Sequence, residues 1–96
     1  MRKQVVIVGA GPAGLLLGRL LDLDGIDNVV LERQTQEYVL ARIRAGILEQ
    51  TTVDLIHRAE AGTRLSDEGI PHHAVNLVYD HKSVAIGLSE HTNGKV

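Results

Sequence analysis

Six residues near the amino end of the chain have the types and the spacing that bind a pyrophosphate. Residues 9–14 read Gly-Ala-Gly-Pro-Ala-Gly and match the pattern G-x-G-x-x-G. In this pattern Gly9 makes a tight turn, Gly11 lets the backbone approach the phosphates, and Gly14 lets a helix pack closely on a strand. The first turn of the helix offers unpaired N–H groups and a partial positive charge. The motif therefore predicts a site for two linked phosphates.

An acidic residue stands where such a motif needs a partner for the neighbouring sugar. Glu32 follows a short apolar run, at the distance along the chain that the dinucleotide fingerprint requires. Its carboxylate would accept hydrogen bonds from the ribose hydroxyls of an adenosine and would repel a 2′-phosphate. This residue predicts FAD or NAD as the bound nucleotide rather than NADP.

The glycines have two other interpretations. A P-loop is excluded because Leu15 and Leu16 occupy the positions of its lysine and its serine or threonine. The glycines could also do no more than make a tight turn between a strand and a helix. The strand pattern before them, the helix pattern after them and Glu32 all favour nucleotide binding over this simpler interpretation.

The residues around the motif have the pattern of a β–α–β unit. Residues 4–8 are a continuous β-branched run, typical of a strand buried on both faces. The leucines after the motif recur at helical spacing (Leu16, Leu20, Leu23), and Gly25 is a typical left-handed stop. Residues 28–31 form a second apolar run. This order predicts two parallel strands joined by a right-handed crossover.

The remaining residues predict one more helix and a hairpin. Residues 33–45 are polar and interrupted, which indicates a loop or a single helical turn, whereas 46–59 carry apolar residues at helical spacing. Residues 63–71 are typical of a turn-rich connection. Polar and apolar residues alternate on both sides of Asp80-His81-Lys82, which predicts an antiparallel hairpin. The predicted fold class is α/β: a Rossmann-type βαβ unit, then a helix and an antiparallel β-hairpin.

Composition excludes several classes of function. The 96 residues include no cysteine, which excludes disulfides, cysteine-based zinc sites and thiol nucleophiles. A formal charge of −2 argues against nucleic-acid binding and a polybasic membrane anchor. Arg2 and Lys3 precede an apolar stretch, as in a secretory signal, but the glycines at 9–14 interrupt it, and no run approaches the roughly 20 apolar residues of a membrane span. We therefore expect a cytoplasmic protein.

Three stretches resemble the class A flavoprotein aromatic hydroxylases: VVIVGAGPAGLLLG, GIDNVVLERQT and YVLARIRAGILEQ. The resemblance implies FAD as cofactor, NADPH as co-substrate, and hydroxylation of a small phenolic acid with O₂ by a homodimeric enzyme. Members of the family are much longer than this chain, and two parallel strands with a hairpin leave a parallel sheet poorly covered. We expect residues 1–96 to be the amino-terminal part of an FAD-binding domain, without the rest of that domain or a substrate domain.

The resemblance also implies roles for individual residues. Gly9, Gly11, Ala13 and Gly14 would line the FAD pyrophosphate, and Glu32 would bind the adenosine ribose; Ala13 stands where relatives often have serine. A second segment would wrap around FAD, with Arg44 facing its phosphates: Arg42, Ile43, Arg44, Ala45, Gly46 and Ile47. From the residues alone, Arg42 and Arg44 in an extended segment project to the same side, where paired guanidiniums suit a pyrophosphate. The alternative is two solvated loop charges.

Two further sites follow from the resemblance. Arg33, Gln34 and Tyr38 match the family segment near which NADPH approaches; the alternative is a half-buried Tyr38 beside a solvated Arg33. His72 coincides with a family histidine that relays a substrate proton to solvent, and the alternative is an exposed loop histidine. No metal site is predicted, because the adjacent His72 and His73 would point to opposite faces of a strand.

Two other functions stay open at this stage. One is a NAD-dependent dehydrogenase unit, which would bind NAD without taking up flavin. The other is a non-catalytic nucleotide-binding or degraded remnant that folds poorly, and a cooperative unfolding transition of the isolated 96 residues would argue against it.

Overall fold

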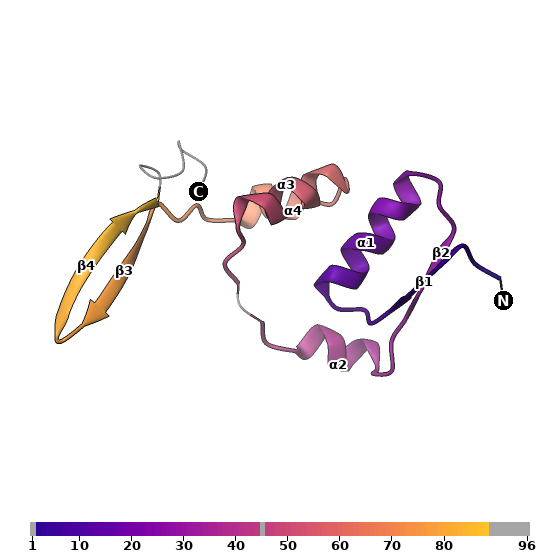
Figure 1. The fold of residues 1–96 in the computed structure, drawn as a ribbon, viewed down its shortest axis with the longest axis horizontal. Helices are drawn as coiled ribbons and strands as arrows, with labels where there is room; N and C mark the ends of the chain where they lie inside the picture. Colours follow the sequence, from indigo (N-terminus) through magenta and orange to yellow (C-terminus); the bar gives the residue numbers. More distant parts are fainter. Residues whose placement is uncertain (1, 45, 89–96) are drawn as a thin grey trace.

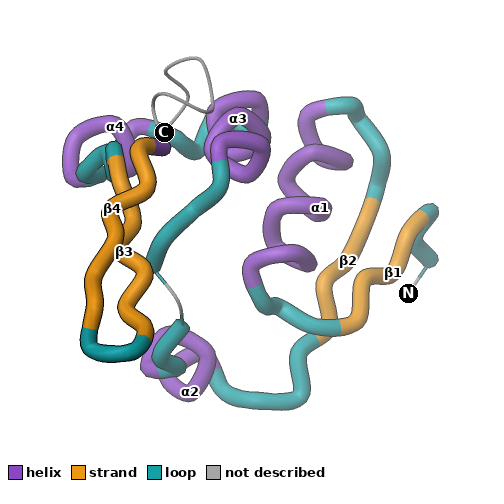
Figure 2. Tube along the Cα trace, turned by 60° about the vertical axis from the view of Figure 1, so that its left-hand side comes forward, coloured by secondary structure: helices purple, strands orange, loops and turns teal. Residues whose placement is uncertain are grey.

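The computed structural model describes residues 2–44 and 46–88, which form short helices and two separate two-stranded sheets (Figure 1). Along the chain the elements are β1 (Val5–Val8), α1 (Pro12–Leu23), β2 (Asn28–Leu31), α2 (Gln36–Ala41), α3 (Gln50–Arg58), α4 (Thr63–Glu68), β3 (Ala74–Tyr79) and β4 (Lys82–Gly87). In both Figure 1 and Figure 2, α1 lies alongside the β1–β2 pair, and the β3–β4 hairpin lies at the opposite end of the molecule.

The first three elements form the predicted β–α–β unit. β1 and β2 are parallel, with Val5 opposite Asn28 and Val8 opposite Leu31. α1 connects the two strands and packs against both. Gly25 follows the helix with a φ of +73°, in the left-handed region that the sequence predicts for it.

Two glycines let α1 lie close to the strands. A Cβ at Gly14 would overlap the carbonyl oxygen of Gly9, and a Cβ at Gly18 would lie 3.1 Å from Cγ2 of Val30. The Asn28 side chain donates from Nδ2 to the Gly18 carbonyl (3.3 Å), which ties the start of β2 to the middle of α1. Gly14 was predicted to have this packing role, whereas Gly18 was not, although it lies one helical turn further along the same face.

The helices after β2 differ from the prediction. Residues 36–41 form α2, which is longer than a single turn. The Thr35 hydroxyl caps its start by accepting a hydrogen bond from the Tyr38 N–H (3.1 Å). α3 begins at Gln50, later than the predicted start at Gly46, because the backbone at Glu49 is extended (φ −71°, ψ 155°).

The prediction of a connection without a helix over 63–71 was wrong, because Thr63–Glu68 forms α4. This segment contains one large apolar residue, Leu65, so it has no helical periodicity to detect. An ion pair between Arg64 Nε and Glu68 Oε2 (3.0 Å) spans one turn and supports the helix.

The predicted antiparallel hairpin is confirmed. β3 pairs with β4 so that Tyr79 lies opposite Lys82 and Ala74 opposite Gly87. Asp80 and His81 make the turn with φ values of +46° and +58°, as the central residues of a type I′ turn do. Lys82 is the first residue of β4 rather than part of the turn.

The described part of the chain buries few side chains. Its buried apolar residues are Ile7, next to α1, and Ala59, at the end of α3. Many large apolar side chains on β1, α1 and the hairpin are more than 40% exposed, among them Val6, Val8, Leu77 and Val78. None of the described helices has the length and apolar character needed to cross a membrane.

Candidate functional site

The turn between β1 and α1 presents open backbone. Gly9 has a φ of +109°, a conformation that favours glycine, and Gly11 precedes the helix as its N-cap. Pro12 begins α1. The Leu15 N–H donates a hydrogen bond to the Gly11 carbonyl (3.0 Å), which closes the first turn of the helix. Among the described residues, no side chain caps this N-terminus and no acidic residue lies in its first turn. The amino end of α1 is thus free to receive an anion.

Arg44 lies next to this open backbone. A Cβ placed on Gly11 would have only Arg44 Nη2 near it among the described residues, at 3.8 Å. The space beside Gly11 is therefore a cradle that a side chain would fill, with a guanidinium on its far side. A pyrophosphate in this cradle would meet backbone N–H groups and a cation together.

Glu32 is held beside the same turn. Its Oε1 accepts a hydrogen bond from the Ala10 N–H, and its Oε2 accepts one from the Gln34 N–H, both at 3.4 Å. A hollow of about 360 Å³ adjoins the carboxylate, and its lining combines the turn, α1 and α2: Ala10, Leu15, Glu32, Gln34, Gln36, Val39 and Leu40. A carboxylate at the end of β2 and a mostly apolar hollow suit a ribose and the flat ring attached to it.

The two predicted arginines have different neighbours. Arg42 ends α2 and donates from Nη1 to the Tyr38 hydroxyl (2.8 Å), and its guanidinium lies 5.6 Å from the centre of the Tyr38 ring. Arg44 extends to Gly11 instead. Tyr38 is half-exposed and Arg33 is exposed, so both are accessible to a molecule that approaches from solvent.

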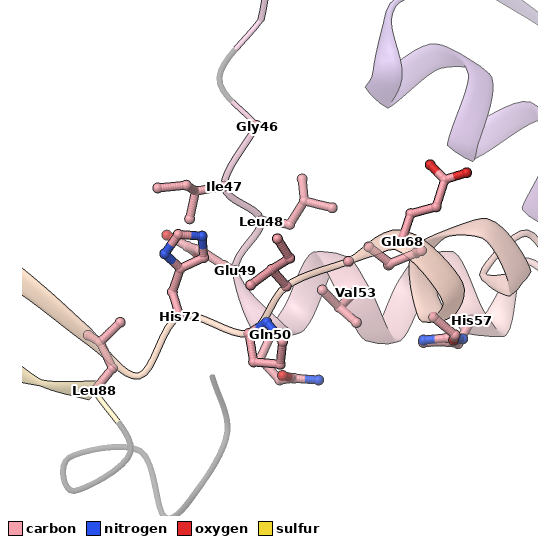
Figure 3. Close-up of a pocket in the computed structure, with 15 residues that line it drawn as sticks. Gly46, Ile47, Leu48, Glu49, Gln50, Val53, His57, Glu68, His72 and Leu88 are labelled. Atoms are coloured by element: carbon pink, nitrogen blue, oxygen red, sulfur yellow. The ribbon is translucent and has the colours of Figure 1, made fainter.

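A second cavity, of about 860 Å³, lies between the segment before α3 and the loop after α4 (Figure 3). It brings His72 together with Gly46 and Ile47, which the family resemblance implies to be near FAD. The cavity also has polar groups that sequence reasoning missed: Glu49, Gln50, His57, Ser66 and Glu68. Their positions depend on where α3 starts and on the existence of α4, and the sequence signals neither.

The other predicted residues are placed as follows. Gly14 and Ala13 lie in the first turn of α1, and Ile43 is 97% exposed in the segment after α2. Ala45 lies outside the described residues. No group of three or more metal-ligating side chains occurs in the part of the chain that the structure describes.

Known proteins are similar in sequence to this chain. A family model described as an FAD binding domain matches residues 2–96. A p-hydroxybenzoate hydroxylase from Acinetobacter baylyi is 44% identical over 95 residues, which are 99% of this chain and 24% of that protein. A dialkyldecalin synthase from Streptomyces rugosporus is 38% identical over 69 residues (72% of this chain and 14% of the synthase).

A shorter match is to a 3-(3-hydroxy-phenyl)propionate/3-hydroxycinnamic acid hydroxylase 2 from Burkholderia vietnamiensis, with 57% identity over 35 residues (36% of this chain and 6% of that protein). The chain thus spans 24% or less of the length of each of these relatives. These matches confirm the predicted resemblance.

Proposed function

The chain belongs to the FAD binding domain family and, within it, to the class A flavoprotein aromatic hydroxylases, and we propose that it holds the ADP half of FAD in such an enzyme. The substrate we propose is 4-hydroxybenzoate, which NADPH and O₂ would convert into 3,4-dihydroxybenzoate. The relative that supports this choice is the p-hydroxybenzoate hydroxylase, which is similar over nearly the whole chain.

One observation carries the proposal: the Arg44 guanidinium faces the uncovered backbone of Gly11, and Glu32 is tied to the same turn. The pyrophosphate would be held by the amino end of α1 and by the residues around it, as in a Rossmann-type unit: Gly9, Gly11, Ala13 and Gly14.

Each group would act on a particular part of the cofactor. Arg44 would neutralise phosphate charge, and Glu32 would accept hydrogen bonds from the adenosine ribose. FAD, when bound, supplies the redox chemistry with NADPH and O₂, and the protein supplies orientation and electrostatics.

The proposal gives roles to the other predicted residues. Arg33, Gln34 and Tyr38 would form an accessible surface that NADPH visits, and Arg42 and Ile43 would lie along FAD. Gly46 and Ile47 would lie along FAD, and His72, in the same cavity, would pass a substrate proton to solvent.

The chain would be the amino-terminal part of a longer, cytoplasmic, homodimeric protein, which we call the parent protein. The exposed apolar side chains of β1 and of the hairpin support the greater length of the parent protein, because a larger domain would cover them.

The parent protein tests the proposal directly. It should bind FAD, measured by calorimetry on the apoprotein, and in the presence of 4-hydroxybenzoate it should consume equal amounts of NADPH and O₂ and release 3,4-dihydroxybenzoate. Binding of NAD without FAD would instead identify a dehydrogenase unit. Bound FAD with no turnover of any phenolic acid would refute the hydroxylase assignment and leave the cofactor site standing.

A further inference from the structure

The described residues on either side of Arg44 bury little apolar surface. Ile43 is 97% exposed and Ile47 is 68% exposed, so apolar burial does not hold this segment in place. Along the chain Arg44 is flanked by α2 and α3, which are regular elements that can hold it in place (Figure 1).

α3 packs against α1, and a polar contact joins the two helices where α3 ends. Arg19, in the second half of α1, donates from Nε to the Ala59 carbonyl (3.1 Å), and its Nη2 lies 3.6 Å from Glu60 Oε2. Ala59 is completely buried. The last carbonyls of a helix lack partners and carry partial negative charge, so a guanidinium is well suited to bind them.

Of the two contacts, the bond to the carbonyl is the stronger constraint. The Glu60 side chain is 69% exposed, and exposed ion pairs contribute little. Glu60 also has a φ of +57°, in the left-handed region where glycine usually follows a helix. Its N–H donates to the His57 carbonyl (2.9 Å), which completes the turn that ends α3.

We propose that Arg19 is a positioning residue for the cofactor site: it docks the end of α3 on α1 and so holds the segment that presents Arg44 to Gly11. α1 then fixes both sides of the phosphate cradle, with the open turn at its amino end and the anchor of the Arg44 segment further along. This inference rests on the proposed function, because its readout is FAD affinity.

Two variants of the parent protein isolate the carbonyl contact. Gln places its Nε2 where Arg has Nε, and Met places a methyl group there, so Arg19→Gln keeps a donor for Ala59 and Arg19→Met removes it. We expect the Kd for FAD to rise roughly three- to tenfold in Arg19→Met and to stay within about twofold of wild type in Arg19→Gln. The matched control is Arg64→Met, which removes a different exposed ion pair, that of Arg64 with Glu68, and should leave the Kd for FAD unchanged.

A double-mutant cycle with Arg44→Ala separates positioning from general stability. If Arg19 acts through Arg44, the loss caused by Arg19→Met disappears in the Arg44→Ala background. The thermal midpoint of each apoprotein shows that the compared variants are folded, and Arg19→Ala replaces Arg19→Met in the cycle if the latter does not fold.

Three results would overturn the inference while the proposed function stands: FAD bound equally well by Arg19→Met and wild type, an equal loss of affinity in both backgrounds, or a folded Arg19→Gln that binds as poorly as Arg19→Met. Failure of the wild-type parent protein to bind FAD would overturn the proposed function itself.

Discussion

Gly11 is the residue of the candidate site at which a single substitution should impair ligand binding most directly. Its backbone is extended (φ −77°, ψ −178°), a conformation that any residue adopts, so a side chain here leaves the fold intact. A side chain at Gly11 lowers the affinity for the ligand instead, because it occupies the space between the backbone and Arg44.

We expect Gly11→Val to weaken FAD binding by the parent protein at least about a hundredfold, since the branched side chain keeps the pyrophosphate away from the backbone N–H groups. Calorimetric titration of the apoprotein measures the loss. The thermal midpoint of the apoprotein should be close to that of wild type, and flavin retained at wild-type affinity would contradict the site.

Arg44→Ala should weaken FAD binding by about 1.5–3 kcal/mol, the range for a hydrogen bond to a charged group. The wild-type affinity should also fall more steeply with added salt than that of the variant, because the contact is between exposed charges. Arg42→Ala is the comparison: Arg42 contacts Tyr38, so its loss should change FAD affinity less than the loss of Arg44. Equal losses for the two arginines would show that both bind the same phosphates.

At the scale of elements, the contact between α1 and the β1–β2 pair depends on which atoms lie against each glycine. At Gly14 an added Cβ overlaps the Gly9 carbonyl oxygen, which is backbone and cannot move alone. At Gly18 it lies 3.1 Å from a methyl group of Val30 and 3.2 Å from Asn28 Oδ1, which are side-chain atoms that small rotations can move away.

We therefore expect Gly14→Ala to lower the free energy of unfolding by about 1–3 kcal/mol through overpacking. Gly18→Ala should be close to neutral, because the gain of about 1 kcal/mol in helix propensity offsets the tight contact. Urea unfolding of the two parent-protein variants compares them directly. A Gly18→Ala variant as unstable as Gly14→Ala would mean that Val30 is held rigidly.

The hairpin turn offers a stabilising change away from the site. Asp80 and His81 both have positive φ, which costs free energy for residues other than glycine and favours Asn-Gly at these positions. Replacing the pair by Asn-Gly should raise the free energy of unfolding by about 0.5–1 kcal/mol in urea titrations. FAD affinity should not change, and a destabilised variant would show that the two side chains have contacts that the turn needs.

The elements that the sequence predicts well are those with a strong local signal. The β–α–β unit has apolar periodicity and glycines at both ends of its helix. The bounds of its elements in the structure agree with the prediction to within one residue. α4 has one large apolar residue, and the start of α3 is set by the extended backbone at Glu49, so neither could be read from spacing. The approach of Arg44 to Gly11 joins distant parts of the chain. The spacing of Arg42 and Arg44 indicated only that their guanidiniums suit a pyrophosphate, and the family resemblance placed Arg44 at the phosphates.

At the scale of the whole molecule, the described chain is extended rather than compact. Its radius of gyration is 17.5 Å, and its extents are 57 × 28 × 22 Å. A compact domain of this length would have a radius of about 12.5 Å. The two sheets do not share a core, and strand residues such as Val8 (86% exposed) and Val78 (75% exposed) have little apolar cover within the described residues.

This exposure predicts how the 96-residue chain behaves when it is produced by itself. Little apolar surface is removed from water on folding, so the urea dependence of its unfolding free energy should fall below about 1 kcal/mol per molar, the lower end for small domains. The exposed strands should bind the dye ANS strongly, whereas the parent protein should bind it weakly because further chain covers them. A steep, cooperative transition together with weak ANS binding by the isolated chain would show that its apolar faces are buried in solution, and would remove this support for a larger parent protein.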